Sequence, residues 1–302
     1  GEAEEALEEE RAFVEEVTED DVQGQLAEII KGGEPVFLFE GRSEIGPRAL
    51  GHRSILADPR RGGLVHYINS KVKGRESFRP FAPSVLAEEV GGWFEVGGED
   101  AEGDVSPWMS LTLAVKADRA PLIPAVLHVD GTSRLQTVTA ARSPFYHGLI
   151  RRFFEATGVP MVLNTSFNTV KGEPIVETPR DAFQSWLGCG GVGVISLDGR
   201  VFRRRSGAIE EGSRVGRRGR FAAKTFEDAE GVAYRAEVRM EGRENLGDVD
   251  VGSRLAVEVL GLCDGEAVAG EVAEELGEEW EAVREVLESM REKGLVYSHT
   301  PM

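Results

Sequence analysis

The chain has 302 residues, of which 41% are hydrophobic and 29% are charged, a composition typical of a folded protein with room for two domains. It carries 35 Lys and Arg against 53 Asp and Glu, a net charge of −18 that repels nucleic acids and anionic membranes unless basic residues gather locally. No apolar run approaches the ~20 residues of a membrane helix, and the first residues do not resemble a signal peptide. Two distant cysteines exclude a disulfide framework. We therefore expect a cytoplasmic protein with reduced thiols.

The first 30 residues predict an acidic helical lead-in. Acidic residues dominate it, and spaced apolar residues from Phe13 to Ile30 predict an amphipathic helix that Asp20 or Asp21 caps. Gly32 and Gly33 are expected to end this helix. Because the chain begins with Gly1 rather than Met, the alternatives are an added residue and a chain cut from a longer protein.

Residues 36–200 alternate short apolar runs with helical patterns, which favours an α/β fold with mostly buried strands. Strands are expected at Val36–Phe39, Leu111–Val115, Thr137–Val138, Val159–Leu163 and Val192–Leu197. Helices are expected at Leu64–Lys73, Ser143–Thr157 and Pro179–Leu187. Thr178 is a favourable cap for the last helix, and Pro179 stands in the first turn, where a proline is tolerated.

The remaining third differs in character. Residues 203–224 are rich in Lys, Arg, Gly and Ser, which predicts a basic solvated linker; a basic patch for an acidic partner is the alternative. Residues 225–302 predict a second unit with a strand at 232–240 and three helices at 251–263, 268–276 and 280–293. Asp264 and Gly265 read as a turn, and a short strand is expected after Gly294. This order is a winged-helix plan.

A basic segment in the first unit carries the clearest chemical signal. Residues 42–80 hold nine Lys or Arg and three acidic residues, so their net charge is 9 − 3 = +6 in a protein of −18. Arg offers bidentate donors to phosphate and Lys a point charge, so this concentration favours a small polyanion. Surface ion pairing is the alternative reading.

Two further polar clusters follow predicted strands or turns. His128–Thr137 places Arg134 beside a glycine turn, and Asn164–Asn168 follows the apolar run that ends at Leu163. The carboxyl end of a strand is where α/β sheets commonly bind ligands, although simple turns use the same residues. The chain lacks a His pair at helical metal-binding spacing, a P-loop and a GxSxG motif, so no metal ligands are assigned and a nucleotide would be held by Arg and Lys.

Five ordered motifs carry a family resemblance: EGRSEIGPRALGHRSILADPR, RESFRPFAPSVL, HVDGTSRLQTV, GVPMVLNTSFN and GEPIV. Residues 15–202 resemble the C-terminal domain of the NodU/CmcH/tobramycin-type O-carbamoyltransferases. The resemblance implies a YrdC-like (Sua5-like) open twisted sheet with a basic concave face. It also implies that the domain binds ATP, Mg²⁺ and carbamoyl phosphate and forms carbamoyl-adenylate.

The same motifs assign residues by resemblance. Catalytic roles fall on three basic residues, Lys73, Arg79 and Arg134. Binding of ATP or carbamoyl phosphate falls on Arg48, Arg53, Arg75, Ser166 and Asn168, of which Ser166 and Asn168 match an S-x-N signature that contacts the nucleotide or its metal. Physically, these groups would neutralise charge at the α-phosphorus while a carbamate oxygen attacks and pyrophosphate leaves.

Two departures from the family pattern are visible. The Kae1-like half that passes the carbamoyl group to an acceptor is missing from this chain, so the resemblance implies a partner subunit or a longer protein. The spacing between TSFN and GEPIV is slightly longer than usual, and Lys171 in it receives no role.

The second unit resembles PqqD-type peptide-recognition domains, mainly through the segment Leu262-Cys-Asp-Gly265. That resemblance implies capture of a leader peptide as an added strand; a winged helix used for packing is the alternative. For the whole chain, the alternative to a carbamoyltransferase component is a catalytically silent module that binds a nucleotide or RNA and recruits a peptide.

Overall fold

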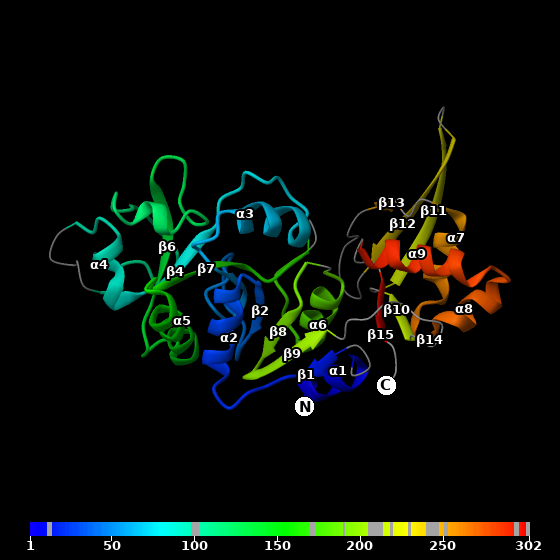
Figure 1. Ribbon diagram of the computed structural model, residues 1–302, viewed down its shortest axis with the longest axis horizontal. Helices are drawn as coiled ribbons and strands as arrows, with labels where there is room; N and C mark the ends of the chain where they lie inside the picture. Colours follow the sequence, from blue (N-terminus) through cyan, green and yellow to red (C-terminus); the bar gives the residue numbers. More distant parts are fainter. Residues whose placement is uncertain are drawn as a thin grey trace.

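A computed structural model describes residues 1–10, 14–97, 103–169, 173–189, 191–204, 214–217, 220–228, 231–239, 248–250, 253–292 and 296–299. The described residues form one large unit around a nine-stranded sheet, followed by a smaller second unit (Figure 1). Among them, no helix is both long and apolar enough to cross a membrane.

The large sheet is open and mixed, with the strand order β1-β9-β8-β2-β3-β7-β4-β6-β5. Its strands are β1 (Val14–Glu16), β2 (Val36–Phe39), β3 (Arg53–Ala57), β4 (Ala82–Leu86), β5 (Leu111–Ala114), β6 (Thr132–Val138), β7 (Met161–Ser166), β8 (Val194–Leu197) and β9 (Arg200–Arg204). Parallel pairs join β2 to β8 and β4 to β6, and the other neighbours are antiparallel. The α/β expectation is confirmed.

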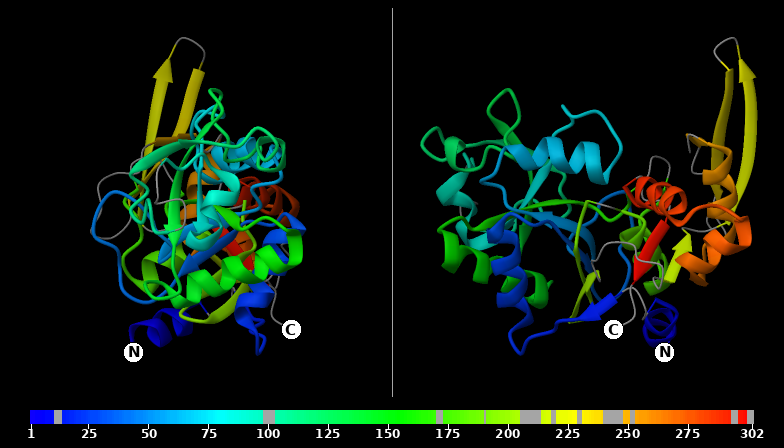
Figure 2. Two further views of the ribbon diagram at one scale, coloured as in Figure 1. Left: turned by 90° about the vertical axis from the view of Figure 1, so that its left-hand side faces the viewer. Right: turned by 45° about the vertical axis from the view of Figure 1, so that its right-hand side comes forward.

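Helices lie against this sheet and connect its strands. They are α1 (Glu2–Glu10), α2 (Val22–Gly32), α3 (Gly63–Tyr67), η1 (Ile68–Val72), η2 (Ala87–Glu89), α4 (Val90–Trp93), η3 (Ala120–Leu122), α5 (Pro144–Thr157) and α6 (Pro179–Leu187). Helices α2 and α5 lie side by side (Figures 1 and 2) and bury Leu26, Ile30 and Phe153. Their burial removes apolar surface from water and supplies the main stabilisation of this layer.

Local signals explain where two helices begin. The Asp21 side chain accepts a hydrogen bond from Gly24 N at the start of α2. Thr178 accepts from Asp181 N, and the Asp181 carboxylate accepts from Thr178 N, so α6 begins with a capping box. Both caps were predicted.

The acidic lead-in differs from its prediction in one respect. Between α1 and α2 the chain forms β1, which pairs with β9 as the edge of the large sheet. Ala6 of α1 is buried, and α1 packs against α6. The segment is thus partly built into the domain, because pairing satisfies backbone groups that a solvated lead-in would leave to water.

The second unit contains β10 (Arg214–Arg217), β11 (Arg220–Asp228), β12 (Gly231–Arg239), β13 (Asp248–Asp250), α7 (Arg254–Leu262), β14 (Asp264–Val268), α8 (Ala269–Leu276), α9 (Trp280–Glu292) and β15 (Val296–His299). One sheet has the order β14-β10-β15 and another the order β11-β12-β13. Val259, Val272 and Leu287 bury one side of each helix in a common core. The three expected helices are present.

Two expectations for this region need correction. The stretch 203–224 includes β10 and the start of β11, so the described part of the expected linker is largely strand. Asp264 and Gly265, expected as a turn, begin β14, which pairs with β10. Backbone pairing from outside the local sequence overrides the turn preference of this dipeptide.

Candidate functional site

Strand register brings the sequence motifs to one edge of the large sheet. Phe39 at the end of β2 pairs with Arg53 at the start of β3, and Ser54 pairs with Ser166 at the end of β7. Strand β4 runs antiparallel to β7 and parallel to β6, so β4 and β6 begin at the edge where β7 ends. We call it the motif edge: the loops 40–52, 73–81 and 127–131 and the turn 166–169.

Lys73 is buried at the motif edge and contacts two of the predicted binding residues. Its Nζ lies 2.7 Å from Asn168 Oδ1, 2.9 Å from Asn168 O and 3.3 Å from Ser166 Oγ, and it also donates to Ser166 O. Ser166 Oγ in turn donates to Asn168 Oδ1 at 2.8 Å. Burial, assisted by the positive charge of Arg75, lowers the pKa of Lys73 to about 7. Residues that are 93 positions apart thus form one cluster.

The buried Glu173 side chain holds the turn that carries this cluster. Glu173 Oε2 accepts hydrogen bonds from Thr169 N, Thr169 Oγ1 and Ser185 Oγ. Asn168 Nδ2 donates to Glu173 O at 2.7 Å. Through its hydrogen bonds to Thr169 and the bond from Asn168 Nδ2, Glu173 fixes the end of the turn. Sequence reasoning assigned it no role, although it lies in the GEPIV motif.

Arg134 and Arg48 form the second basic group. Arg134 lies on β6, and burial together with the positive charge of exposed Arg48 lowers the pKa of its guanidinium. The positive charges of Arg134 and Arg48 repel each other, and an anion bound between them would relieve this repulsion. Within the described residues, Arg134 Nε is buried without a hydrogen-bond partner. An orphaned buried donor of this kind fits an anionic ligand.

Arg75 and Arg79 lie on the loop that leads into β4. Arg75 Nε donates to Asn69 Oδ1 at 2.7 Å, and its guanidinium lies 5.0 Å from the centre of the Phe81 ring. Arg79 is more than half exposed and forms a loose 3.9 Å ion pair with Glu76. An exposed pair of this kind contributes little to stability, so Arg79 is available to a ligand at small cost.

Arg53 is largely occupied by the protein backbone. Its two Nη atoms donate to Glu40 O, His52 O and Gly41 O, and its guanidinium stacks 3.5 Å from the centre of the Phe39 ring. Burial lowers its pKa. In this structure Arg53 holds loop 40–52 against β2, and its predicted anion contact stays a prediction.

A buried polar network beneath the motif edge was missed by the sequence reasoning. Asn164 Nδ2 donates to Ala49 O, Ser84 Oγ and Gln136 Oε1, while Gln136 Nε2 donates to Leu50 O at 2.8 Å. The network therefore ties β7, β4 and β6 to the loop that carries Arg48. Polar residues inside otherwise apolar strand runs were the available signal, and Asn164–Ser166, expected to follow the strand, are its last residues.

Loop 40–52 has two further fixed points. The Glu44 carboxylate accepts from Leu50 N, His52 N and Arg53 N, and burial raises its pKa. Gly51 has φ +109, and a Cβ there would lie 2.1 Å from the Tyr146 ring. Only glycine satisfies both conditions, so the GPRALGHRS motif keeps its shape through packing as well as charge.

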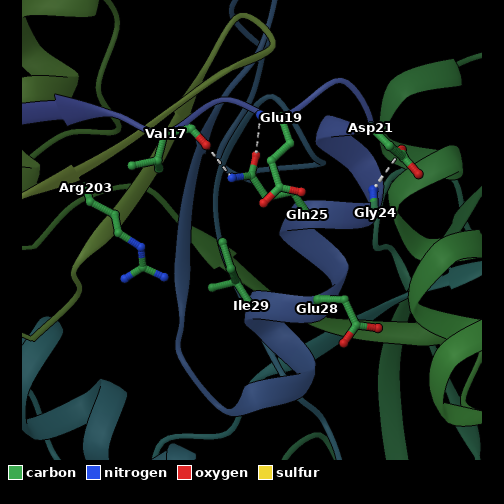
Figure 3. A pocket seen from close by; sticks show the side chains of 8 residues that line it. All are labelled: Val17, Glu19, Asp21, Gly24, Gln25, Glu28, Ile29 and Arg203. Atoms are coloured by element: carbon green, nitrogen blue, oxygen red, sulfur yellow. Dashed lines mark hydrogen bonds between the residues drawn. The ribbon is translucent and has the colours of Figure 1, made fainter.

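A cavity of about 620 Å³ lies elsewhere, beside β1 and the start of α2 (Figure 3). It is lined by Val17, Glu19, Asp21, Gly24, Gln25, Glu28, Ile29 and Arg203, so none of the predicted site residues borders it. Arg203 is paired with Glu34 at 3.1 Å. The acidic lining of this cavity is unsuited to a phosphate ligand.

Comparison with known proteins gives relatives for this arrangement. The chain is 43% identical over 190 residues to an uncharacterized protein of Synechocystis sp., with 56% of this chain and 30% of that protein covered. It is 39% identical over 267 residues to the nodulation protein NolNO of Sinorhizobium fredii, with coverage of 84% and 37%. The chain thus spans about a third of the length of these relatives. A crystal structure of HypF from T. kodakarensis covers 76% of this chain and 31% of its own, at 16% identity and a TM-score of 0.39, a likeness too weak to build on.

A family match covers the large unit directly. Residues 27–204, more than half of the chain, match the family described as Carbamoyltransferase C-terminus. This range contains every strand of the large sheet except β1, together with the whole motif edge. It ends before the second unit, so the PqqD resemblance stays a prediction. By this match the chain belongs to the carbamoyltransferase C-terminal family.

Proposed function

We propose that the large unit forms carbamoyl-adenylate from ATP and carbamoyl phosphate, as a component of a carbamoyltransferase. Carbamoyl phosphate and water give carbamate and phosphate. A carbamate oxygen then bonds to the α-phosphorus of ATP, the bond from that phosphorus to the bridging oxygen breaks, and pyrophosphate leaves. Family membership supports the reaction class, and the position of Lys73, Arg79, Ser166 and Asn168 on the motif edge, with Arg134 near the start of β6, supports assigning the reaction to these residues.

Arg134 is the observation on which the proposal mainly depends. Its Nε is buried and unpartnered, Arg48 is a positive neighbour, and neither arginine forms an ion pair among the described residues. Donors fixed before the substrate binds stabilise developing negative charge without rearrangement. We assign Arg134 and Arg48 to the phosphate or carbamoyl oxygens, with Arg79 reaching in from the exposed loop before β4.

Ser166 and Asn168 are proposed to bind the nucleotide on the adjacent turn. Their side-chain oxygens lie 2.8 Å apart at the end of β7. Within the described residues, no group of three His, Cys, Asp or Glu side chains could hold a metal ion. Mg²⁺ would therefore enter with ATP, which suits an ion that binds proteins largely through phosphates and water. When bound, it supplies neutralisation of the phosphate charge.

The direct experiment is titration of the chain with ATP and Mg²⁺, with and without carbamoyl phosphate, while phosphate and pyrophosphate are measured in the same samples. We expect pyrophosphate release that depends on carbamoyl phosphate and is lost in Arg134→Ala. Binding of ATP without any pyrophosphate release would instead favour the catalytically silent module. A chain that binds neither compound would contradict the proposal.

In our proposal, the large unit alone does not transfer the carbamoyl group to an acceptor. Because the chain spans about a third of the relatives in length, we propose that a Kae1-like part, in the same protein or in a partner, receives the carbamoyl group. The acceptor and the capture of a leader peptide by residues 225–302 stay predictions. Activity assays on the chain alone should therefore follow adenylate formation rather than a carbamoylated product.

A further inference from the structure

The ammonium group of Lys73 is fully used inside the protein. A lysine has three N–H donors, and four oxygen atoms of Ser166 and Asn168 already surround Lys73 Nζ. The residue is only 7% exposed. With every donor engaged and almost no surface in contact with solvent, Lys73 has no free N–H bond to offer a phosphate.

The backbone at Lys73 is fixed as firmly as the side chain. Lys73 N donates to Ile68 O at 2.8 Å, and Arg75 N donates to Asn69 O at 2.9 Å. Asn69 is fully buried, and its Nδ2 donates to Ser77 O and Arg79 O. The loop that carries Lys73 is therefore anchored on both sides of this residue, so the ammonium is delivered to one place.

The turn 166–169 needs a cation at that place. Ser166 O, Asn168 O and Asn168 Oδ1 all lie within hydrogen-bond distance of one point, and oxygen atoms gathered in this way repel each other without a shared donor. The other supports act elsewhere: Phe167 N bonds to Arg53 O, and Thr169 bonds to Glu173. Ser166 and Asn168 are also joined directly, by Ser166 Oγ to Asn168 Oδ1 and by Asn168 N to Ser166 O at 3.1 Å, and Lys73 adds the one charged donor that binds oxygens of both residues among those described.

We propose that Lys73 is a positioning residue, which shapes the Ser166–Asn168 turn for the nucleotide and makes no phosphate contact of its own. This assignment differs from the catalytic role that the motif predicts for Lys73. It rests on the proposed function in so far as the turn binds ATP. Arg134, Arg48 and Arg79 then supply the charge that faces the phosphates.

A double-mutant cycle on ATP affinity tests how Lys73 acts. Lys73→Met and Asn168→Ala are each expected to weaken binding at least tenfold, and the double variant is expected to bind within about twofold of the weaker single variant, because both changes damage one turn. Lys73→Met combined with Arg134→Gln is the matched control, and these losses should multiply. Losses that multiply for Lys73 and Asn168 would overturn the proposal.

Amide hydrogen exchange of the ligand-free chain gives an answer that needs no nucleotide. In Lys73→Met the amides of Asn168 and Thr169 should exchange at least tenfold faster than in the unchanged protein, while amides of α5 should not change. Unaltered exchange would contradict the positioning role. If Lys73→Met fails to fold, Lys73→Gln keeps two donors and should give a smaller acceleration. Absence of ATP binding in the unchanged chain would refute the proposed function and leave this measurement decisive for Lys73.

Discussion

Gln136 offers the sharpest test of how the motif edge is held together. It is buried on β6, donates to Leu50 O at 2.8 Å, and accepts from Ser84 Oγ at 2.6 Å and from Asn164 Nδ2 at 3.2 Å. Gln136→Met keeps the length of the side chain and removes all three bonds. At about 1 kcal/mol for each bond, the free energy of unfolding should fall by about 3 kcal/mol.

Ser133 on the same strand is the matched control. It is also fully buried, but its hydroxyl makes one hydrogen bond, to Val126 O at 2.6 Å, so Ser133→Ala should cost about 1 kcal/mol. Urea unfolding followed by tryptophan fluorescence reports mainly on the large unit, because Trp93, Trp108 and Trp186 lie in it. Equal losses in the two variants, within about 0.5 kcal/mol, would refute the network argument. Gln136→Met should also weaken ATP binding, since Leu50 belongs to the loop of Arg48.

Four further outcomes are expected. Arg134→Gln should lower pyrophosphate release at least about a hundredfold, whereas Arg142→Gln, whose ion pair with Asp104 lies beyond the other end of β6, should change it less than about twofold. ATP affinity should fall as pH rises through about 7, because Lys73 then loses its proton and one donor; Lys73→Arg, which stays charged, should show no such step in titrations from pH 6 to pH 8. Asp198 accepts from Gly41 N, so Asp198→Ala should cost about 1 kcal/mol in urea unfolding and Asp198→Asn less than about 0.5. Chelation of Mg²⁺ by EDTA should stop pyrophosphate release, and full release in EDTA would contradict a metal–ATP substrate.

Strands that carry an unbroken apolar run were predictable, and strands that do not were missed. Val36–Phe39 is buried at every position and reads clearly as β2. Strand β3 begins with Arg53 and Ser54, and β4 contains Pro83, so their local sequences resemble loops. Both become strands because β7 pairs with them from about 80 to 110 residues away in sequence. Pairing partners at that distance leave no trace in a local pattern.

The residue types of the site were predictable, but the division of labour among them was not. The motifs assigned catalytic roles to Lys73 and Arg134 and a binding role to Arg53, so all three cations were expected to face the ligand. In the structure, the donors of Lys73 go to the Ser166–Asn168 turn, and the Nη donors of Arg53 go to loop 40–52. Arg134 Nε and Arg53 Nε are both buried without a partner in the part of the chain that the structure describes, but the Arg134 guanidinium lacks the backbone contacts that hold the Nη atoms of Arg53. Whether a cation bonds to the protein or is left for a ligand depends on the oxygen atoms that the fold places beside it.

The register of β7 links the packing of the sheet to the geometry of the site. Ser166 lies opposite Ser54 only because Leu163 pairs with Ala57 three residues earlier, and that pairing is fixed by apolar burial on both strands. A shift by one residue would turn Asn164 away from Ser84 and Gln136 and would move Ser166 away from Lys73, because neighbouring strand residues face opposite sides. The apolar core of the sheet therefore sets the geometry of the polar site. Core substitutions that loosen β7 should reduce nucleotide binding before they unfold the domain.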